Sequence, residues 1–185
     1  MIKFNNPADA ADWLVQGKIL IHPTEGVWGI GCDAFNQSAV KKINSLKGRE
    51  ASKSLILLAP SIIDALSYLK PLSKSKLEFI DKIWPGHTTV VSDANESILD
   101  YLKPINNTVA LRVSNHKPII NLMSIFKKLM VSTSANLSNL STPQTLKEIE
   151  ENFSDPDVGI YYFKNGNSKK PSAIIDLNSM EYIRE

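Results

Sequence analysis

The stretch Val131-Ser132-Thr133-Ser134-Ala135-Asn136-Leu137-Ser138 joins a strand pattern to a dense run of polar side chains. The apolar residues Leu129 to Val131 predict a short buried strand. Five of the eight residues in the stretch carry a hydroxyl or an amide, which can both donate and accept hydrogen bonds. Such residues at the C-terminal end of a strand are typical of ligand sites in α/β sheets. A Ser/Thr/Asn turn that caps the next helix fits this stretch alone equally well.

The bulk composition favours a globular protein of the cytoplasm. The chain has 185 residues, of which 43% are apolar and 22% charged, enough for one sizeable core. No apolar run approaches the roughly 20 residues of a membrane span, and the N-terminus lacks the apolar core of a signal peptide. The single cysteine, Cys32, allows no internal disulfide. A net charge of +2 is too small to imply nucleic-acid binding by itself.

Arginine is used at three isolated places in a lysine-rich chain. Of 21 basic residues only Arg49, Arg112 and Arg184 are arginines. The planar guanidinium binds phosphate and carboxylate in a bidentate way that lysine cannot. Composition bias is the simpler alternative, so each arginine has to be judged by its surroundings.

Hydrophobic periodicity predicts one α/β domain over residues 1–185. Helices are expected at 7–16, 36–46, 61–68, 73–83, 96–102, 117–126 and 145–151, and strands at 18–21, 55–58, 87–91, 107–113, 129–131, 158–163, 171–177 and 182–184. The segment 22–33 is expected to be irregular, because its glycines suit neither a helix nor a strand. The sheet should be mixed, since the last strands follow one another without intervening helices.

Two further places have the chemistry of a ligand site. The loop after the second helix carries Lys47, Arg49 and Lys53, which suit a polyphosphate clamp, although lysines alone would indicate a solvated loop. Arg112 lies in an apolar strand and should have an anionic partner from the protein or a ligand. Thr24 follows a strand in the glycine-rich segment, which contains neither GxxxxGK[ST] nor GxGxxG.

Taken together, the motifs resemble the YrdC/TsaC family, the threonylcarbamoyl-AMP synthases, in their short bacterial form. The matching stretches occur in family order: Pro23-Thr24-Glu25, Gly29-Ile30-Gly31-Cys32-Asp33, Lys47-Gly48-Arg49, Leu55-Ile56-Leu57, Trp84-Pro85-Gly86, Val109-Ala110-Leu111-Arg112-Val113, Ser132 to Ser138, and Pro171-Ser172-Ala173-Ile174-Ile175-Asp176. Each motif is weak alone, but the ordered set is specific and includes the surroundings of all three arginines.

The resemblance implies a twisted open α/β sheet with a concave basic face. It also implies a nucleotidyltransferase reaction in which L-threonine, bicarbonate or CO₂, and ATP with Mg²⁺ give threonylcarbamoyl-AMP and pyrophosphate. Partner proteins would pass the threonylcarbamoyl group to the adenosine beside the tRNA anticodon. We expect a cytoplasmic monomer without membrane contact, with weak RNA binding left open.

The resemblance also implies residue roles. Lys47 and Arg49 would be catalytic, and the ATP site would comprise Lys47, Arg49, Lys53, Thr108, Ser134, Asn136, Thr142 and Arg184. Threonine would be bound by Thr24, Arg112, Ser132 and Ser172, with Arg112 on its carboxylate. No protein metal site is expected, because the sequence shows no dense carboxylate cluster.

Two alternatives remain open. A non-catalytic module that binds structured RNA would also have a basic concave face, but a charge of +2 and the lack of an RNA-stacking aromatic motif count against it. A domain that acts on another carbamoyl adenylate, as in hydrogenase maturation, is disfavoured by the absence of fused zinc-finger or acylphosphatase segments.

Overall fold

The computed structural model describes residues 1–50, 53–103, 106–138, 140–168 and 170–185. Its strands are β1 Ile2–Phe4, β2 Ile19–His22, β3 Gly29–Asp33, β4 Ile56–Leu58, β5 Thr88–Asp93, β6 Thr108–Arg112, β7 Met130–Ser134, β8 Val158–Tyr161, β9 Ala173–Asp176 and β10 Glu181–Arg184. In this described part they form one ten-stranded sheet in the order β1-β8-β2-β3-β7-β4-β6-β5-β9-β10. Four neighbouring pairs are parallel and five antiparallel, which confirms the mixed sheet.

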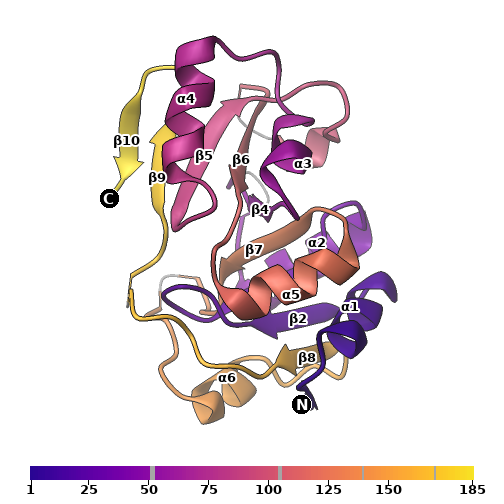
Figure 1. Cartoon of the computed structure of the whole chain (residues 1–185). Coiled ribbons are helices and arrows are strands. Elements are labelled where there is room, and N and C mark those ends of the chain that lie inside the picture. The colour runs from indigo at the N-terminus through magenta and orange to yellow at the C-terminus, as the bar shows by residue number, and fades with distance from the viewer. Residues whose placement is uncertain (51–52, 104–105, 139, 169) are drawn as a thin grey trace.

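Helices flank this open, twisted sheet (Figure 1). They are α1 Pro7–Val15, α2 Gln37–Lys47, α3 Ile62–Leu66, α4 Lys74–Ile83, α5 Lys117–Phe126 and α6 Leu146–Asn152, with a 3₁₀ turn η1 at Asp100–Leu102. Most begin at a residue whose side chain accepts a hydrogen bond from a backbone N–H of the first turn: Asn6, Asn36, Ser61, Ser73 and Thr145. No described helix has the length and apolar character needed to cross a membrane.

The register of β7 assigns its side chains to two faces of the sheet. Ser132 lies opposite Gly31 of β3 and Ile56 of β4, and Ser134 lies opposite Gly29. Cross-strand partners project to the same face and successive residues to opposite faces. Ser132 and Ser134 therefore share one face of the sheet, and Val131 belongs to the core on the other side.

The two faces are covered unequally. The larger core lies on the Val131 face and includes residues from α2, α3, α4 and α6. On the serine face, α1 and α5 pack on Leu20, Leu58 and Met130, toward one end of their strands. The remainder of that face, around Ile56 and Ile174, lines an open cavity.

The structure corrects two expectations and adds a strand. Residues 29–33 form β3, although the glycines led us to expect irregular chain; a Cβ on Gly29 would lie 2.4 Å from the His22 ring, and one on Gly31 would lie 2.1 Å from the Val131 carbonyl oxygen. Those glycines allow a close approach inside a regular strand. The prediction of an amphipathic helix at 96–102 is wrong, because only the three-residue 3₁₀ turn η1 forms there. The N-terminal strand β1 was not anticipated and pairs in parallel with β8.

Candidate functional site

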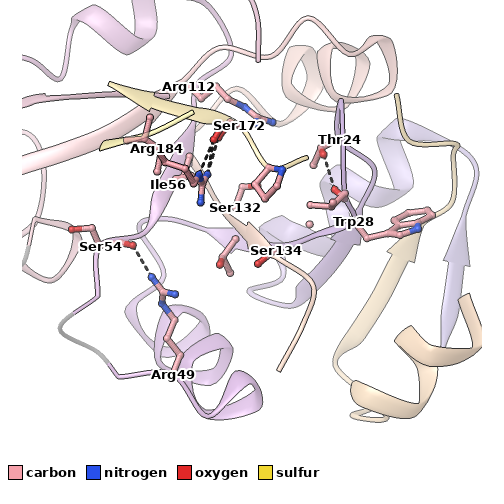
Figure 2. Close-up of a pocket in the computed structure, with 15 residues that line it drawn as sticks. Thr24, Trp28, Arg49, Ser54, Ile56, Arg112, Ser132, Ser134, Ser172 and Arg184 are labelled. Carbon is pink, nitrogen blue, oxygen red and sulfur yellow. Dashed lines mark hydrogen bonds between the residues drawn. The ribbon is translucent and has the colours of Figure 1, made fainter. Parts of the chain in front are cut away.

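The open part of the serine face contains a cavity of about 260 Å³ (Figure 2). It collects side chains from widely separated segments: the β2–β3 loop, the loop after α2, the ends of β6 and β7, and the C-terminal hairpin. Of the twelve predicted site residues, seven line it: Thr24, Arg49, Arg112, Ser132, Ser134, Ser172 and Arg184. The fold thus brings all four predicted threonine-binding residues to one cavity.

All three arginines of the chain line this cavity. Burial lowers the pKa of each guanidinium below its usual value, yet arginine remains charged at any physiological pH. Of the three arginines, only Arg112 has a carboxylate within ion-pair distance among the described residues. The cavity therefore has a net positive wall, which favours an anionic ligand.

Arg112 is held by a buried carboxylate from the β2–β3 loop. Its Nη2 lies 2.9 Å from Oε2 of Glu25, while Ser114 Oγ donates to Oε1 of Glu25 at 2.7 Å. Arg112 is only 4% exposed. The anionic partner expected from the sequence is therefore present in the protein, as the Glu25 carboxylate. The Nε atom of Arg112 is buried and has no hydrogen-bond acceptor among the described residues.

Arg184 comes from β10 and reaches back over the end of β9. Its Nε and Nη2 donate to the carbonyl oxygen of Ser172 at 3.0 and 2.6 Å. The Ser172 hydroxyl forms a 2.9 Å hydrogen bond with the Thr89 hydroxyl of β5. Arg184 is therefore oriented by a neutral carbonyl, and none of the described carboxylates lies within ion-pair distance of it.

Arg49 follows the left-handed cap of α2 at Gly48, whose φ is +57°. Its Nη2 donates to the Ser54 carbonyl oxygen at 2.8 Å, and its Nε is buried without an acceptor in the described part. Residues 51 and 52 of this loop lie outside the described residues. The guanidinium lies at the cavity wall opposite the Arg184 side chain (Figure 2).

The side chains of Lys47 and Asn136 form hydrogen bonds that hold the turn after β7. The Lys47 Nζ donates to the carbonyl oxygens of Ser134 and Asn136, each at 2.5 Å. Burial, together with the nearby Arg49 charge, lowers the pKa of Lys47 to about 8. The Asn136 amide donates to the carbonyl oxygens of Leu137 and Leu140 and accepts from the Ser134 hydroxyl. In this structure both side chains support the turn and do not line the cavity.

Thr24 is fixed within a tightly bonded loop. Its hydroxyl donates to the Val27 carbonyl oxygen at 2.6 Å and accepts from the Gly26 N–H at 3.1 Å. The Lys170 backbone lies so close to this loop that a Cβ on Gly26 would be 1.9 Å from the Lys170 carbonyl oxygen. Gly26 is therefore required by the close approach of two backbones.

Three predicted ATP residues lie away from the cavity lining. Lys53 is exposed, and Thr142 is half-buried. Thr108 begins β6 opposite Asp93, at the other end of the strand from Arg112. Among the described residues no group of three or more His, Cys, Asp or Glu side chains could hold a metal ion.

Comparison with known proteins identifies the family of this chain. The family model Sua5_yciO_yrdC, described as telomere recombination, matches residues 12–185. The chain belongs to the Sua5/YciO/YrdC family.

Two synthases of this family match nearly the whole chain, and a longer Sua5 protein contains a domain of the same fold. A threonylcarbamoyl-AMP synthase from Vibrio parahaemolyticus is 34% identical over 174 residues, covering 93% of this chain and 94% of the relative. One from Buchnera aphidicola is 36% identical over 173 residues, covering 92% and 90%. Among solved structures, P. abyssi Sua5 complexed with L-threonine superposes with a TM-score of 0.88 at 26% identity, over 96% of this chain and 55% of that chain.

The sequence did not identify every residue of the site. Glu25 was noted only as part of a motif, and its pairing with Arg112 joins residues 87 apart in the chain. Trp28 and Ser54 also line the cavity. The requirement for an anion near Arg112 was the one signal that pointed to Glu25.

Proposed function

We propose that this protein is a threonylcarbamoyl-AMP synthase, a nucleotidyltransferase that makes threonylcarbamoyl-AMP and pyrophosphate from L-threonine, bicarbonate or CO₂, and ATP. The observation that supports this most is the convergence of the only three arginines on one hydroxyl-lined cavity. Relatives that carry this name match nearly the whole chain. The product would serve tRNA modification, through partner proteins that transfer the threonylcarbamoyl group.

The proposed reaction needs no covalent nucleophile from the protein. The threonine amine combines with CO₂ to give a carbamate, and a carbamate oxygen attacks the α-phosphorus of ATP. The bond to the bridging oxygen breaks, and pyrophosphate leaves with that oxygen. Most of the catalytic effect should come from positioning the reactants and neutralising phosphate charge.

The cavity divides naturally between the two larger substrates. Arg112 would bind the threonine carboxylate, with Thr24, Ser132 and Ser172 around the rest of the amino acid. Arg49 and Arg184, which lack carboxylate partners in the described part, would bind ATP phosphates. Ser134, which lies two residues along β7 from Ser132 on the same face, would face the nucleotide.

The other assigned nucleotide residues would act differently. Lys47 would add positive charge beside the turn, where its Nζ donates to two carbonyl oxygens and keeps one N–H donor for a phosphate. Lys53, Thr108, Asn136 and Thr142 remain proposals for parts of the nucleotide beyond the cavity. Mg²⁺ would be held by the phosphates and water, which suits an ion that usually keeps several waters.

A pyrophosphate-release assay tests the proposal. ATP, L-threonine and bicarbonate are supplied together and then omitted one at a time. Release that needs all three supports the synthase. Absence of release, together with tight salt-sensitive binding of structured RNA, would instead favour a binding module.

A further inference from the structure

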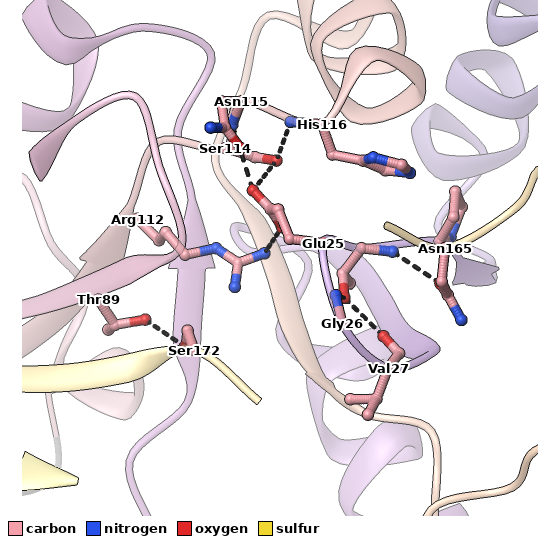
Figure 3. Close-up of polar contacts among 12 residues, drawn as sticks. Glu25, Gly26, Val27, Thr89, Arg112, Ser114, Asn115, His116, Asn165 and Ser172 are labelled. Carbon is pink, nitrogen blue, oxygen red and sulfur yellow. Dashed lines mark hydrogen bonds and ion pairs between the residues drawn. The ribbon is translucent and has the colours of Figure 1, made fainter. Parts of the chain in front are cut away.

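The Glu25 carboxylate accepts three hydrogen bonds from the protein. Oε2 accepts from Arg112 Nη2 at 2.9 Å, and Oε1 accepts from Ser114 Oγ at 2.7 Å and from the Asn115 N–H at 3.2 Å (Figure 3). Burial raises the pKa of Glu25, but the Arg112 charge and the Ser114 hydrogen bond outweigh it, so the net pKa lies below the usual value. A carboxylate in this state is a poor proton acceptor for the threonine amine.

The backbone around Glu25 is fixed as firmly as its side chain. The Ser168 N–H donates to the Glu25 carbonyl oxygen at 3.0 Å, and the Gly166 N–H donates to the Thr24 carbonyl oxygen at 2.8 Å. The Asn165 side chain accepts from the Thr24 N–H at 3.0 Å. Two distant segments, 165–168 and 112–115, therefore hold one carboxylate in place.

The fixed position of the Glu25 carboxylate orients the Arg112 guanidinium. One terminal nitrogen points to Glu25, and the other is directed away from it (Figure 3). The Arg112 side chain lines the cavity although it is almost completely buried. A planar fork fixed at one nitrogen presents its remaining N–H groups in a set direction.

We propose that Glu25 is a positioning residue, which orients Arg112 for the carboxylate of the amino-acid substrate and neutralises its charge when the cavity is empty. This rests on the proposed function. The Glu25–Arg112 pair then suits a zwitterionic amino acid, whereas Arg49 and Arg184, which have no carboxylate partner in the described part of the chain, suit a polyanion. Glu25 thereby determines amino-acid affinity without touching the substrate.

A double-mutant cycle tests this role. The variants are Glu25→Gln, Arg112→Lys and the pair together, with KM for threonine and for ATP measured by pyrophosphate release. Threonine affinity is also measured by calorimetric titration of L-threonine into each protein, which does not depend on turnover. We expect Glu25→Gln to raise the threonine KM about tenfold or more, with the ATP KM unchanged. Because Glu25 acts through Arg112, the pair should resemble Arg112→Lys alone.

Asp33→Asn is the matched control. The Asp33 side chain is 9% exposed and the Glu25 side chain 10%, and Asp33 also pairs with a cation, Lys128, at 2.9 Å. It does not line the cavity. A general effect of breaking a partly buried ion pair should appear in both variants, whereas a loss of threonine affinity should appear only in Glu25→Gln.

The outcomes separate the two proposals. An unchanged threonine KM in Glu25→Gln, or fully additive effects in the cycle, would overturn the positioning role while leaving the synthase intact. An inactive wild-type protein would contradict the synthase, and the threonine titrations would still decide the role of Glu25. If Glu25→Gln does not fold, Ser114→Ala removes one hydrogen bond to Oε1 and should weaken threonine binding about fivefold; no change there would also contradict the role.

Discussion

Replacing Arg112 by lysine keeps the positive charge but removes the planar guanidinium group. Arg112 is 4% exposed and pairs with Glu25 at 2.9 Å, so lysine can still satisfy the buried carboxylate. Its ammonium lacks the second arm of the fork that faces the cavity. The variant should therefore fold, whereas Arg112→Ala would leave Glu25 unpaired and cost about 3–5 kcal/mol of stability.

The expected loss follows from one charge-assisted hydrogen bond to the threonine carboxylate. Such a bond contributes about 1.5–3 kcal/mol, which corresponds to a drop of roughly 10- to 150-fold in kcat/KM for threonine. The ATP KM should stay within about twofold, because Arg49 and Arg184 are untouched. Pyrophosphate release at varied threonine and saturating ATP measures the first quantity, and the reverse titration measures the second. Unchanged threonine dependence would remove Arg112 from the amino-acid site.

Three further perturbations give distinct outcomes. Arg49→Ala should reduce pyrophosphate release by about 100-fold or more through loss of a transition-state phosphate contact, and near-normal turnover would count against that contact. Gly26→Ala would place a Cβ 1.9 Å from the Lys170 carbonyl oxygen; thermal unfolding should show a loss of about 1–3 kcal/mol, and an unchanged melting temperature would mean that the two backbones separate freely. His22 has its pKa lowered by burial from 6.5 to about 4, so between these values the unfolded chain takes up a proton that the folded chain does not, and the free energy of unfolding should fall by up to ~3 kcal/mol as pH falls. Urea titrations of His22→Gln should lack that part of the pH dependence, and an identical slope would contradict it.

Local sequence patterns predicted the parts of the fold that local physics determines. The apolar run before Ser132 predicted the strand that forms β7, in which Ser132 and Ser134 lie on one face. The glycines of β3 misled the same reasoning, because their role is a close approach to His22 and to the β7 backbone. The need for glycine there comes from the neighbouring strands β2 and β7, so the local sequence pattern of β3 does not show it. The three-residue β1 is likewise too short to show a period.

The site was predictable in its chemistry more than in its geometry. Scarce arginines in separate motifs pointed to anion contacts, and the structure brings all three to one cavity. The loop lysine Lys47 looked like a phosphate ligand from its position, but its Nζ is directed to two carbonyl oxygens behind the turn. The sequence does not show which acceptors Lys47 reaches, because they are determined by the position of the β7 end relative to the end of α2.

The central claim is that one cavity binds an amino acid and ATP together and joins them through CO₂. Pyrophosphate release by the wild-type protein, with ATP, L-threonine and bicarbonate each present or omitted, tests it most directly. We expect release only when all three are present, with threonylcarbamoyl-AMP as the co-product. Release from ATP that is independent of threonine, or no release under any combination, would contradict it.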